Sequence, residues 1–158
     1  MLFFVDKYRN FKDLKMAENK EKYEISEKKF WEIVKKINWK KLCAEHRDPV
    51  KFGRKIVRND LDLSVEEIEA CHDMCINLFH KLRDIAELEC MRRCGHKDVN
   101  CIKPDTRRLK DVSVSDDGFY DMLNHVIGLG KERYEAAVKN VDEMWVPNYK
   151  ECFAYVFQ

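Results

Sequence analysis

The chain has 158 residues, enough for one domain that buries a single hydrophobic core without covalent or metal cross-links. Its 30 Lys and Arg residues nearly balance 29 Asp and Glu residues, which excludes a global field that would draw the protein to nucleic acid or an acidic membrane. Charged residues make up 37% of the chain, beside only 5 Gly and 3 Pro. This balance predicts an all-α protein, a compact single domain of about five to six helices.

The first residues are expected to form a charged N-terminal extension. The apolar run Met1 to Val5 is too short for a signal peptide or a membrane span. Without an export signal we expect a cytoplasmic location, where the seven cysteines would be thiols. Lys and Glu are densely mixed after this run, so the extension is predicted over residues 1–25 and a single helical domain over residues 26–158.

Two helices are predicted in the first part of this domain. One begins at Ser26, a residue that suits the N-cap position. Its apolar side chains recur at helical spacing: Phe30, Trp31, Ile33, Val34 and Ile37. The other is shorter and begins at Asp48-Pro49, because proline at the first helical position loses no hydrogen bond. Its apolar residues are Val50, Ile56 and Val57.

The strongest local signal is the capping box Ser64-Val65-Glu66-Glu67. Leu63 and Ile68 flank it as a hydrophobic staple, so a helix is predicted to begin there. An apolar stripe then continues to residue 86: Ile68, Cys71, Cys75, Leu78, Phe79, Leu82, Ile85 and Ala86. Gly95 provides a left-handed stop. The stretch is either one long helix or two helices with a bend near residues 83 and 84.

Residues 95–114 lack a periodic pattern and contain Pro104, so we expect a long connection, which in a compact domain is functional or mobile. The next helix begins at Ser115 or Asp116 and ends at Gly128 and Gly130. Its apolar face consists of Phe119, Met122, Leu123, Val126 and Ile127. Two further helices are predicted, one with Tyr134, Ala137, Val138 and Val141, and a last short one with Tyr149, Cys152, Phe153 and Val156.

Two motifs stand out in this part of the chain. Ser115-Asp116-Asp117-Gly118-Phe119 is followed by Ile127-Gly128-Leu129-Gly130 and then by Lys131-Glu132-Arg133-Tyr134-Glu135-Ala136-Ala137-Val138. With Phe30-Trp31 upstream and residues 63–68 between, their order and spacing resemble the domain of unknown function 4240 family over roughly residues 28–145. That family carries no established activity. The resemblance implies signature positions at Ser115, Asp116, Asp117, Gly118 and Phe119, and no catalytic role for them.

Asp116 and Asp117 are adjacent acids at the start of a helix. Carboxylates there could bind a cation or transfer protons, which is the basis of an enzyme hypothesis. Alternatively they cap the helix and complement its dipole, a contribution of about 1 kcal/mol. We favour the architectural interpretation, and the sequence identifies no catalytic residue.

Four cysteines form two C-x3-C pairs, Cys71 with Cys75 and Cys90 with Cys94. The pattern is similar to that of small mitochondrial intermembrane-space chaperones, in which such cysteines staple a helical hairpin. No Gly or Pro lies between Cys75 and Cys90, however. A continuous helix holds Cys71 and Cys90 about 28 Å apart, whereas a disulfide needs Cα atoms within about 7 Å. We therefore predict buried thiols at Cys71 and Cys75.

Cys90, Cys94, His96 and Cys101 are four potential zinc ligands within twelve residues. Thiolate and imidazole ligands in that number suit a closed tetrahedral site. The C-x3-C-x-H-x4-C spacing matches no standard zinc module, and cysteines at these places are not part of the family's pattern. Zinc is therefore an alternative to packing or surface roles for these residues, and no other cofactor is expected.

The function predicted from the sequence is a non-enzymatic protein-interaction module. We expect its protein partner to bind near the start of the 115–119 motif and the 95–114 connection, with Trp31, Trp39 and Trp145 as candidate anchors if they are exposed. For Trp31 we favour core packing. A structural zinc-binding protein and an enzyme that uses Asp116 and Asp117 are the other two hypotheses.

Nucleic acid and membranes are not expected partners. Residues 92–110 are locally basic, but acidic residues dilute the charge and no aromatic side chain in this stretch offers a base a stacking platform. The sequence predicts neither the partner's identity nor the oligomeric state.

Overall fold

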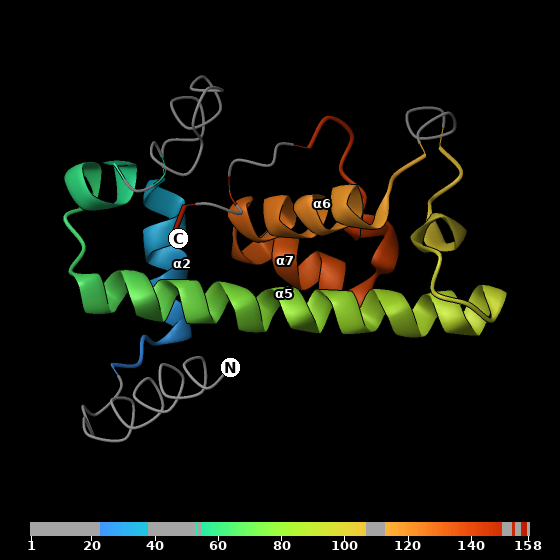
Figure 1. Cartoon of the computed structure of the whole chain (residues 1–158), viewed down its shortest axis with the longest axis horizontal. Helices are drawn as coiled ribbons and strands as arrows, with labels where there is room; N and C mark the ends of the chain where they lie inside the picture. The colour runs from blue at the N-terminus through green and yellow to red at the C-terminus, as the bar shows by residue number, and fades with distance from the viewer. Residues whose placement is uncertain are drawn as a thin grey trace, which may run out of the picture.

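Figure 1 shows the computed structural model of the chain, which describes residues 23–37, 53, 55–106, 113–149, 153, 156 and 157. The elements in these residues are α2 (Glu27–Lys36), the π-helix η1 (Ile56–Asp60), α5 (Val65–Cys94), the 3-10 helix η2 (Val99–Ile102), α6 (Asp116–Gly128), α7 (Lys131–Lys139) and the 3-10 helix η3 (Val141–Met144). All of them are helical, which confirms the all-α prediction. None of the helices in these ranges is both long and apolar enough to cross a membrane.

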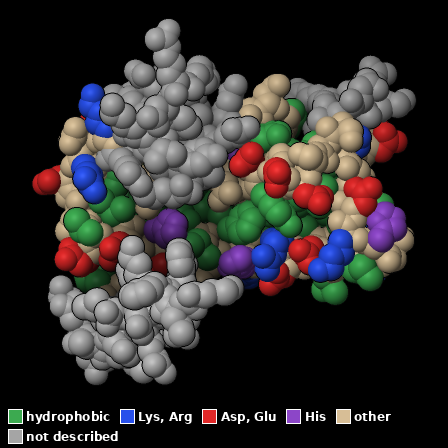
Figure 2. All heavy atoms as spheres, in the orientation of Figure 1, with side chains coloured by type: hydrophobic (Ala, Val, Ile, Leu, Met, Phe, Trp, Pro, Cys, Tyr) green, Lys and Arg blue, Asp and Glu red, His purple; other side chains and the backbone are tan. Residues whose placement is uncertain are grey.

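The longest helix, α5, organises the fold. It extends along one side of the molecule, α6 and α7 lie over it, and α2 crosses near its N-terminal half (Figure 1). It is one uninterrupted helix of 30 residues, so of the two alternatives for this stretch the continuous helix is correct. In Figure 2 hydrophobic side chains gather between α5 and α6. Half-buried Phe79 of α5 meets Tyr120 of α6 edge to face, with ring centroids 5.5 Å apart.

The N-terminal end of α5 is closed by the predicted capping box. The Ser64 hydroxyl accepts a hydrogen bond from the Glu67 N–H at 3.2 Å, and the Glu67 carboxylate accepts one from the Ser64 N–H at 3.0 Å. Leu63 and Ile68 are partly buried against the core, as a staple requires. Lys29 of α2 donates to the Glu67 carboxylate at 2.5 Å, which ties α2 to α5.

All the described helices contribute buried side chains to the core. The five predicted apolar residues of α6 are all at most 1% exposed, and burial of each such side chain stabilises the fold by about 1.5–3 kcal/mol. Trp31 and Trp145 are also buried, at 7% and 3% exposed, and pack against Tyr134 and Phe119 respectively. Core packing, the fate expected for Trp31, is therefore correct, and Trp145 also packs in the core and is not an exposed anchor, whereas Trp39 lies outside the described residues.

Local signals mark both ends of the 95–114 connection. Gly95 adopts a left-handed φ of 73° and donates its N–H to the Met91 carbonyl at 3.0 Å, so it stops α5 as predicted. At the other end the Ser115 hydroxyl accepts from the Gly118 N–H at 3.2 Å. A Cβ on Gly118 would lie 2.8 Å from the Tyr149 hydroxyl, so the glycine of the motif permits this close approach.

Some predictions fall beyond what the structure describes. Residues 1–22 of the extension and the predicted helix start at residues 48–50 lie outside it, although Ile56 and Val57 are buried in η1. Of the last short helix, Phe153 and Val156 are buried and Tyr149 is half-buried, while Cys152 is not described. The 95–114 connection is not wholly irregular, because it contains η2.

Candidate metal centre

The C-terminal end of α5 brings three of the four predicted zinc ligands together. After the left-handed turn at Gly95, η2 folds back against the end of α5. As a result a sulfur or nitrogen atom from each of Cys94, His96 and Cys101 lies within 4.8 Å of the others. Cys101 Sγ lies 3.8 Å from His96 Nε2.

These separations are close to those of a tetrahedral zinc site. With Zn–S bonds of about 2.3 Å and Zn–N bonds of about 2.0 Å, the sulfur and nitrogen ligands of one ion stand about 3.6 Å apart. The observed 3.8 Å exceeds this by a small fraction of a bond length. The three residues can therefore coordinate one ion after small side-chain adjustments.

Cys90 is the fourth predicted ligand and lies outside this group. It precedes Cys94 by one helical turn, its side chain is fully buried, and burial together with the nearby Cys94 thiol raises its pKa. Residues four apart on a helix are neighbours on one face. Cys90 is therefore a candidate fourth ligand, one helical turn from Cys94.

Hydrogen bonds connect one of the three residues, His96, to the backbone before α6. His96 Nδ1 accepts from the Asp98 N–H at 3.3 Å, and the Asp98 carboxylate accepts from the Asn100 N–H at 2.9 Å and from its side-chain amide at 3.1 Å. The Asn100 amide then pairs with Val114 twice, accepting from its N–H at 3.2 Å and donating to its carbonyl at 3.0 Å. Sequence reasoning missed Asn100, whose partner is fourteen residues away.

Metal binding through His96 Nε2 has a small local cost. It places the imidazole proton on Nδ1, which then cannot accept the Asp98 N–H. The loss of such a hydrogen bond costs about 1 kcal/mol. Structural zinc binds with a free energy of about 10–16 kcal/mol, so the loss of this hydrogen bond would not prevent zinc binding.

The cysteine thiols fall into two environments. The Cys94 thiol and partial desolvation raise the pKa of Cys101 to about 11. Burial raises the pKa of Cys71 to about 12. Cys71 is buried as predicted, and Cys75, Cys94 and Cys101 are all intermediate in exposure, but only Cys94 and Cys101 lie beside an imidazole. All five described cysteines are free, in agreement with the argument against a hairpin staple.

Asp116 and Asp117 occupy the first turn of α6 and are exposed. The Ser115 hydroxyl accepts the capping hydrogen bond, and Gly118 allows Tyr149 to approach the helix closely. Phe119 is a core side chain with no exposed surface. At a helix N-terminus the two carboxylates complement the positive end of the dipole. The five signature positions thus have an architectural explanation.

The basic stretch after residue 91 is paired with acids where the structure describes it. Arg92 and Arg93 both donate to Glu89, at 2.6–2.7 Å, and together they lower the pKa of Glu89 to about 2. Lys97 donates to Glu87 at 2.5 Å. These pairs leave little uncompensated positive charge for a phosphate backbone.

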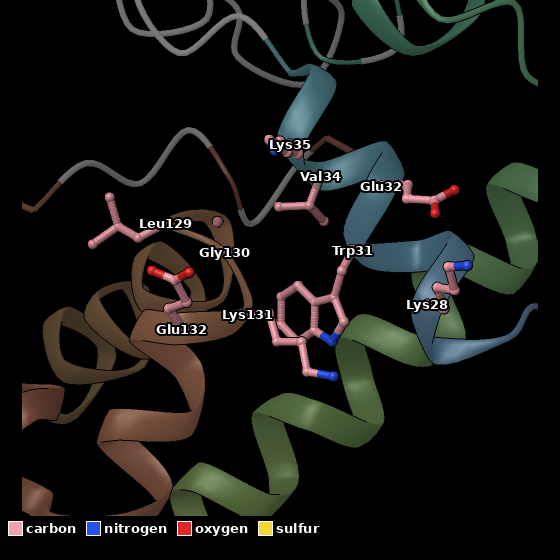
Figure 3. A pocket seen from close by; sticks show the side chains of 10 residues that line it. Lys28, Trp31, Glu32, Val34, Lys35, Leu129, Gly130, Lys131 and Glu132 are labelled. Carbon is pink, nitrogen blue, oxygen red and sulfur yellow. The ribbon is translucent and has the colours of Figure 1, made fainter.

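An open groove of about 560 Å³ lies between α2 and the turn from α6 to α7 (Figure 3). The Trp31 indole projects toward it and donates to Glu27 at 3.0 Å, while Lys131 lies 3.8 Å from Glu27 and 3.7 Å from Glu135. The groove carries both signs of charge and is lined by Lys28, Trp31, Glu32, Val34, Lys35, Gly128, Leu129, Gly130, Lys131 and Glu132. It thus has less defined ligand chemistry than the Cys/His cluster.

The chain matches no model of a known family, no curated protein and no solved structure. The resemblance to the domain of unknown function 4240 family therefore stays a prediction. What the protein does has to be inferred from the side chains themselves, and the cluster at the end of α5 has the most definite chemistry among them.

Proposed function

We propose that this protein is a non-enzymatic helical module of the cytoplasm that binds one structural zinc ion. The site lies at the α5–α6 corner, by which we mean the segment from the end of α5 through η2 to the start of α6. Cys94, His96 and Cys101 are the ligands that already converge, and Cys90 completes the set. The convergence of three ligand atoms within 4.8 Å carries the proposal. It is supported by the half-exposed state of Cys94 and Cys101, since cysteines that serve only for packing are usually buried.

Zinc at this corner would stabilise the connection between two helices. It would hold Cys101 of η2 against Cys94 at the end of α5. Because Asn100 of η2 pairs with Val114, the same ion would fix the backbone that leads into α6. A reducing compartment suits this role, because only thiolates bind the metal.

Titration with Co²⁺ under reducing conditions tests the proposal. We expect thiolate-to-cobalt charge-transfer bands and the visible bands of tetrahedral Co²⁺, both reversed by added Zn²⁺. His96→Ala and Cys101→Ala should each weaken binding by about 100-fold, because a quarter of the binding free energy of a four-ligand site is about 3 kcal/mol.

The matched control is Cys71→Ala, which removes one buried thiol outside the cluster. It should bind Co²⁺ like the wild type. If all three variants bind alike, or if no charge-transfer band appears, the metal is not held by this cluster.

The wider role that we propose is protein binding, and the exposed side of α5 offers its contact residues. Leu88 and Met91 are 74% and 46% exposed in the last two turns of α5, beside the metal cluster. Figure 2 shows hydrophobic side chains on the surface near this end of the helix. Large exposed apolar side chains favour contact with a protein. In a co-purification from the native cell, Leu88→Glu should lose a partner that Val65→Glu, at the other end of α5, retains.

A further inference from the structure

Cys94 and Cys101 are also placed to react with each other. Their sulfur atoms lie within 4.8 Å of each other. A disulfide requires the sulfurs to approach to about 2.05 Å, a change of about 2–3 Å that side-chain rotation can supply. The half-exposed position of both residues leaves the pair open to small oxidants.

Each of the other described cysteines either is buried from oxidants or has no second cysteine placed to form a disulfide with it. Cys71 and Cys90 have no exposed surface. Cys75 is half-buried in the middle of α5, one turn from Cys71, and two cysteines four apart on a continuous helix lie on one face without the geometry of a disulfide. Cys94 and Cys101, by contrast, come from two different elements that fold onto each other.

We propose that Cys94 and Cys101 form a redox-active pair whose oxidation by a hydroperoxide releases the zinc ion. This inference rests on the proposed function, because the two thiolates are also metal ligands. Oxidation removes two of the four ligands at once and leaves Cys90 and His96, which are too few for a structural zinc site. The corner thus loses its zinc ion under peroxide and binds zinc again when a thiol reductant restores the ligands.

The reaction balances without a further co-reactant. One thiolate sulfur attacks a peroxide oxygen, the O–O bond breaks, and a sulfenic acid forms while hydroxide or alkoxide leaves. The second thiolate attacks this sulfur, the S–S bond forms, and hydroxide leaves. Two electrons pass from the two sulfurs to the peroxide, and two protons from water convert the leaving groups to water or alcohol.

The test uses the full chain, loaded with zinc in one arm and treated with chelator in the other. Each arm receives hydrogen peroxide, is alkylated at its free thiols and is digested with trypsin. Cleavage after Arg93 and Lys97 places Cys90, Cys94 and Cys101 on separate peptides, so a disulfide between any two is identified by mass. A metal-sensitive dye records zinc release in parallel.

We expect a Cys94–Cys101 disulfide, two fewer alkylated thiols than the seven cysteines allow, and release of one zinc ion per chain at the same rate. Dithiothreitol should reverse both changes. In the chelator-treated arm Cys101→Ala should form no disulfide at Cys94, whereas Cys71→Ala, with the same number of thiols, should form it normally.

Two outcomes separate this proposal from the one on which it rests. If the protein holds zinc but peroxide links other cysteines, or none, the redox pair is overturned and the structural zinc site stands. A chain that forms the Cys94–Cys101 disulfide yet never holds zinc supports the redox pair and overturns the proposed function.

Discussion

The two ends of α5 are completed in different ways. At the N-terminal end, Ser64 and Glu67 bond each other's backbone N–H groups, and Lys29 joins Glu67 to α2. At the C-terminal end, Gly95 stops the helix, and Cys101 Sγ lies 3.8 Å from His96 Nε2. Side-chain hydrogen bonds and an ion pair close the first end, whereas the second end brings together three side chains that can bind a metal.

This difference indicates that a bound metal ion would add more stability at the C-terminal end of α5 than at its N-terminal end. Sulfur is a weak hydrogen-bond partner, so the contacts among the three ligand side chains stabilise the corner little. The same three side chains are strong ligands for zinc. In our proposal, a zinc ion stabilises the C-terminal end as the capping box stabilises the N-terminal end.

Removal of the metal should produce the largest difference in stability between the two ends of α5. At a free zinc concentration of about 100 times Kd the ion stabilises the fold by about 2.7 kcal/mol, so chelator should lower Tm by about 5–10 °C. Hydrogen exchange should rise at residues 91–102 and at Val114, which Asn100 links to the corner, and stay unchanged at residues 64–68. Equal changes at both ends of α5 would contradict the comparison.

Asn100→Ala should have the next largest effect, because it removes both hydrogen bonds to Val114 and leaves partly buried backbone groups without this partner. The expected loss in the free energy of unfolding is about 1–3 kcal/mol. Urea denaturation measures it, with Asn77→Ala on the exposed side of α5 as the control. If the two variants are equally stable, Asn100 does not hold the corner.

Ser64→Ala breaks the capping box at the other end. It should cost about 1 kcal/mol in the free energy of unfolding and leave the affinity for Co²⁺ unchanged. Ser113→Ala, at an exposed serine, is the control for loss of a hydroxyl. A change in metal affinity would show that the two ends of α5 are not independent.

The smallest expected effect is a pH dependence at the N-terminal end. Lys29 and the Ser64 N–H lower the pKa of Glu67 from its ordinary value of 4.5. The ionised carboxylate therefore stabilises the fold above that value, and the contribution is lost as the pH falls through the lowered pKa. The difference in unfolding free energy between the wild type and Glu67→Gln should be constant near pH 7 and shrink in acid. A difference that grows in acid would have the wrong sign.

The helix ends could be predicted from the sequence because caps act over about three residues. Ser26, Ser64, Gly95 and Ser115 all occupy the predicted positions, and so does the apolar face of α6. The fate of Trp145 could not be predicted, because its burial depends on contact with Phe119, far away in the sequence.

The candidate metal site was only partly predictable for the same reason. The residue types of the four ligands are visible in the sequence, but their convergence depends on how η2 folds back after Gly95. Val99 and Ile102 fix that direction by their burial, and Asn100 fixes it through Val114. The groove beside Trp31 likewise joins α2 to the α6–α7 turn, which no local pattern relates.

The most direct test is the metal content of the full chain, purified under a thiol reductant without chelator or affinity metal and measured by elemental mass spectrometry. We predict one zinc ion per chain for the wild type and for Cys71→Ala, and less than a tenth of that for the double variant Cys94→Ala, Cys101→Ala. A wild-type protein that contains no zinc, and takes up none when zinc is added, would contradict the assignment of the corner as a metal site.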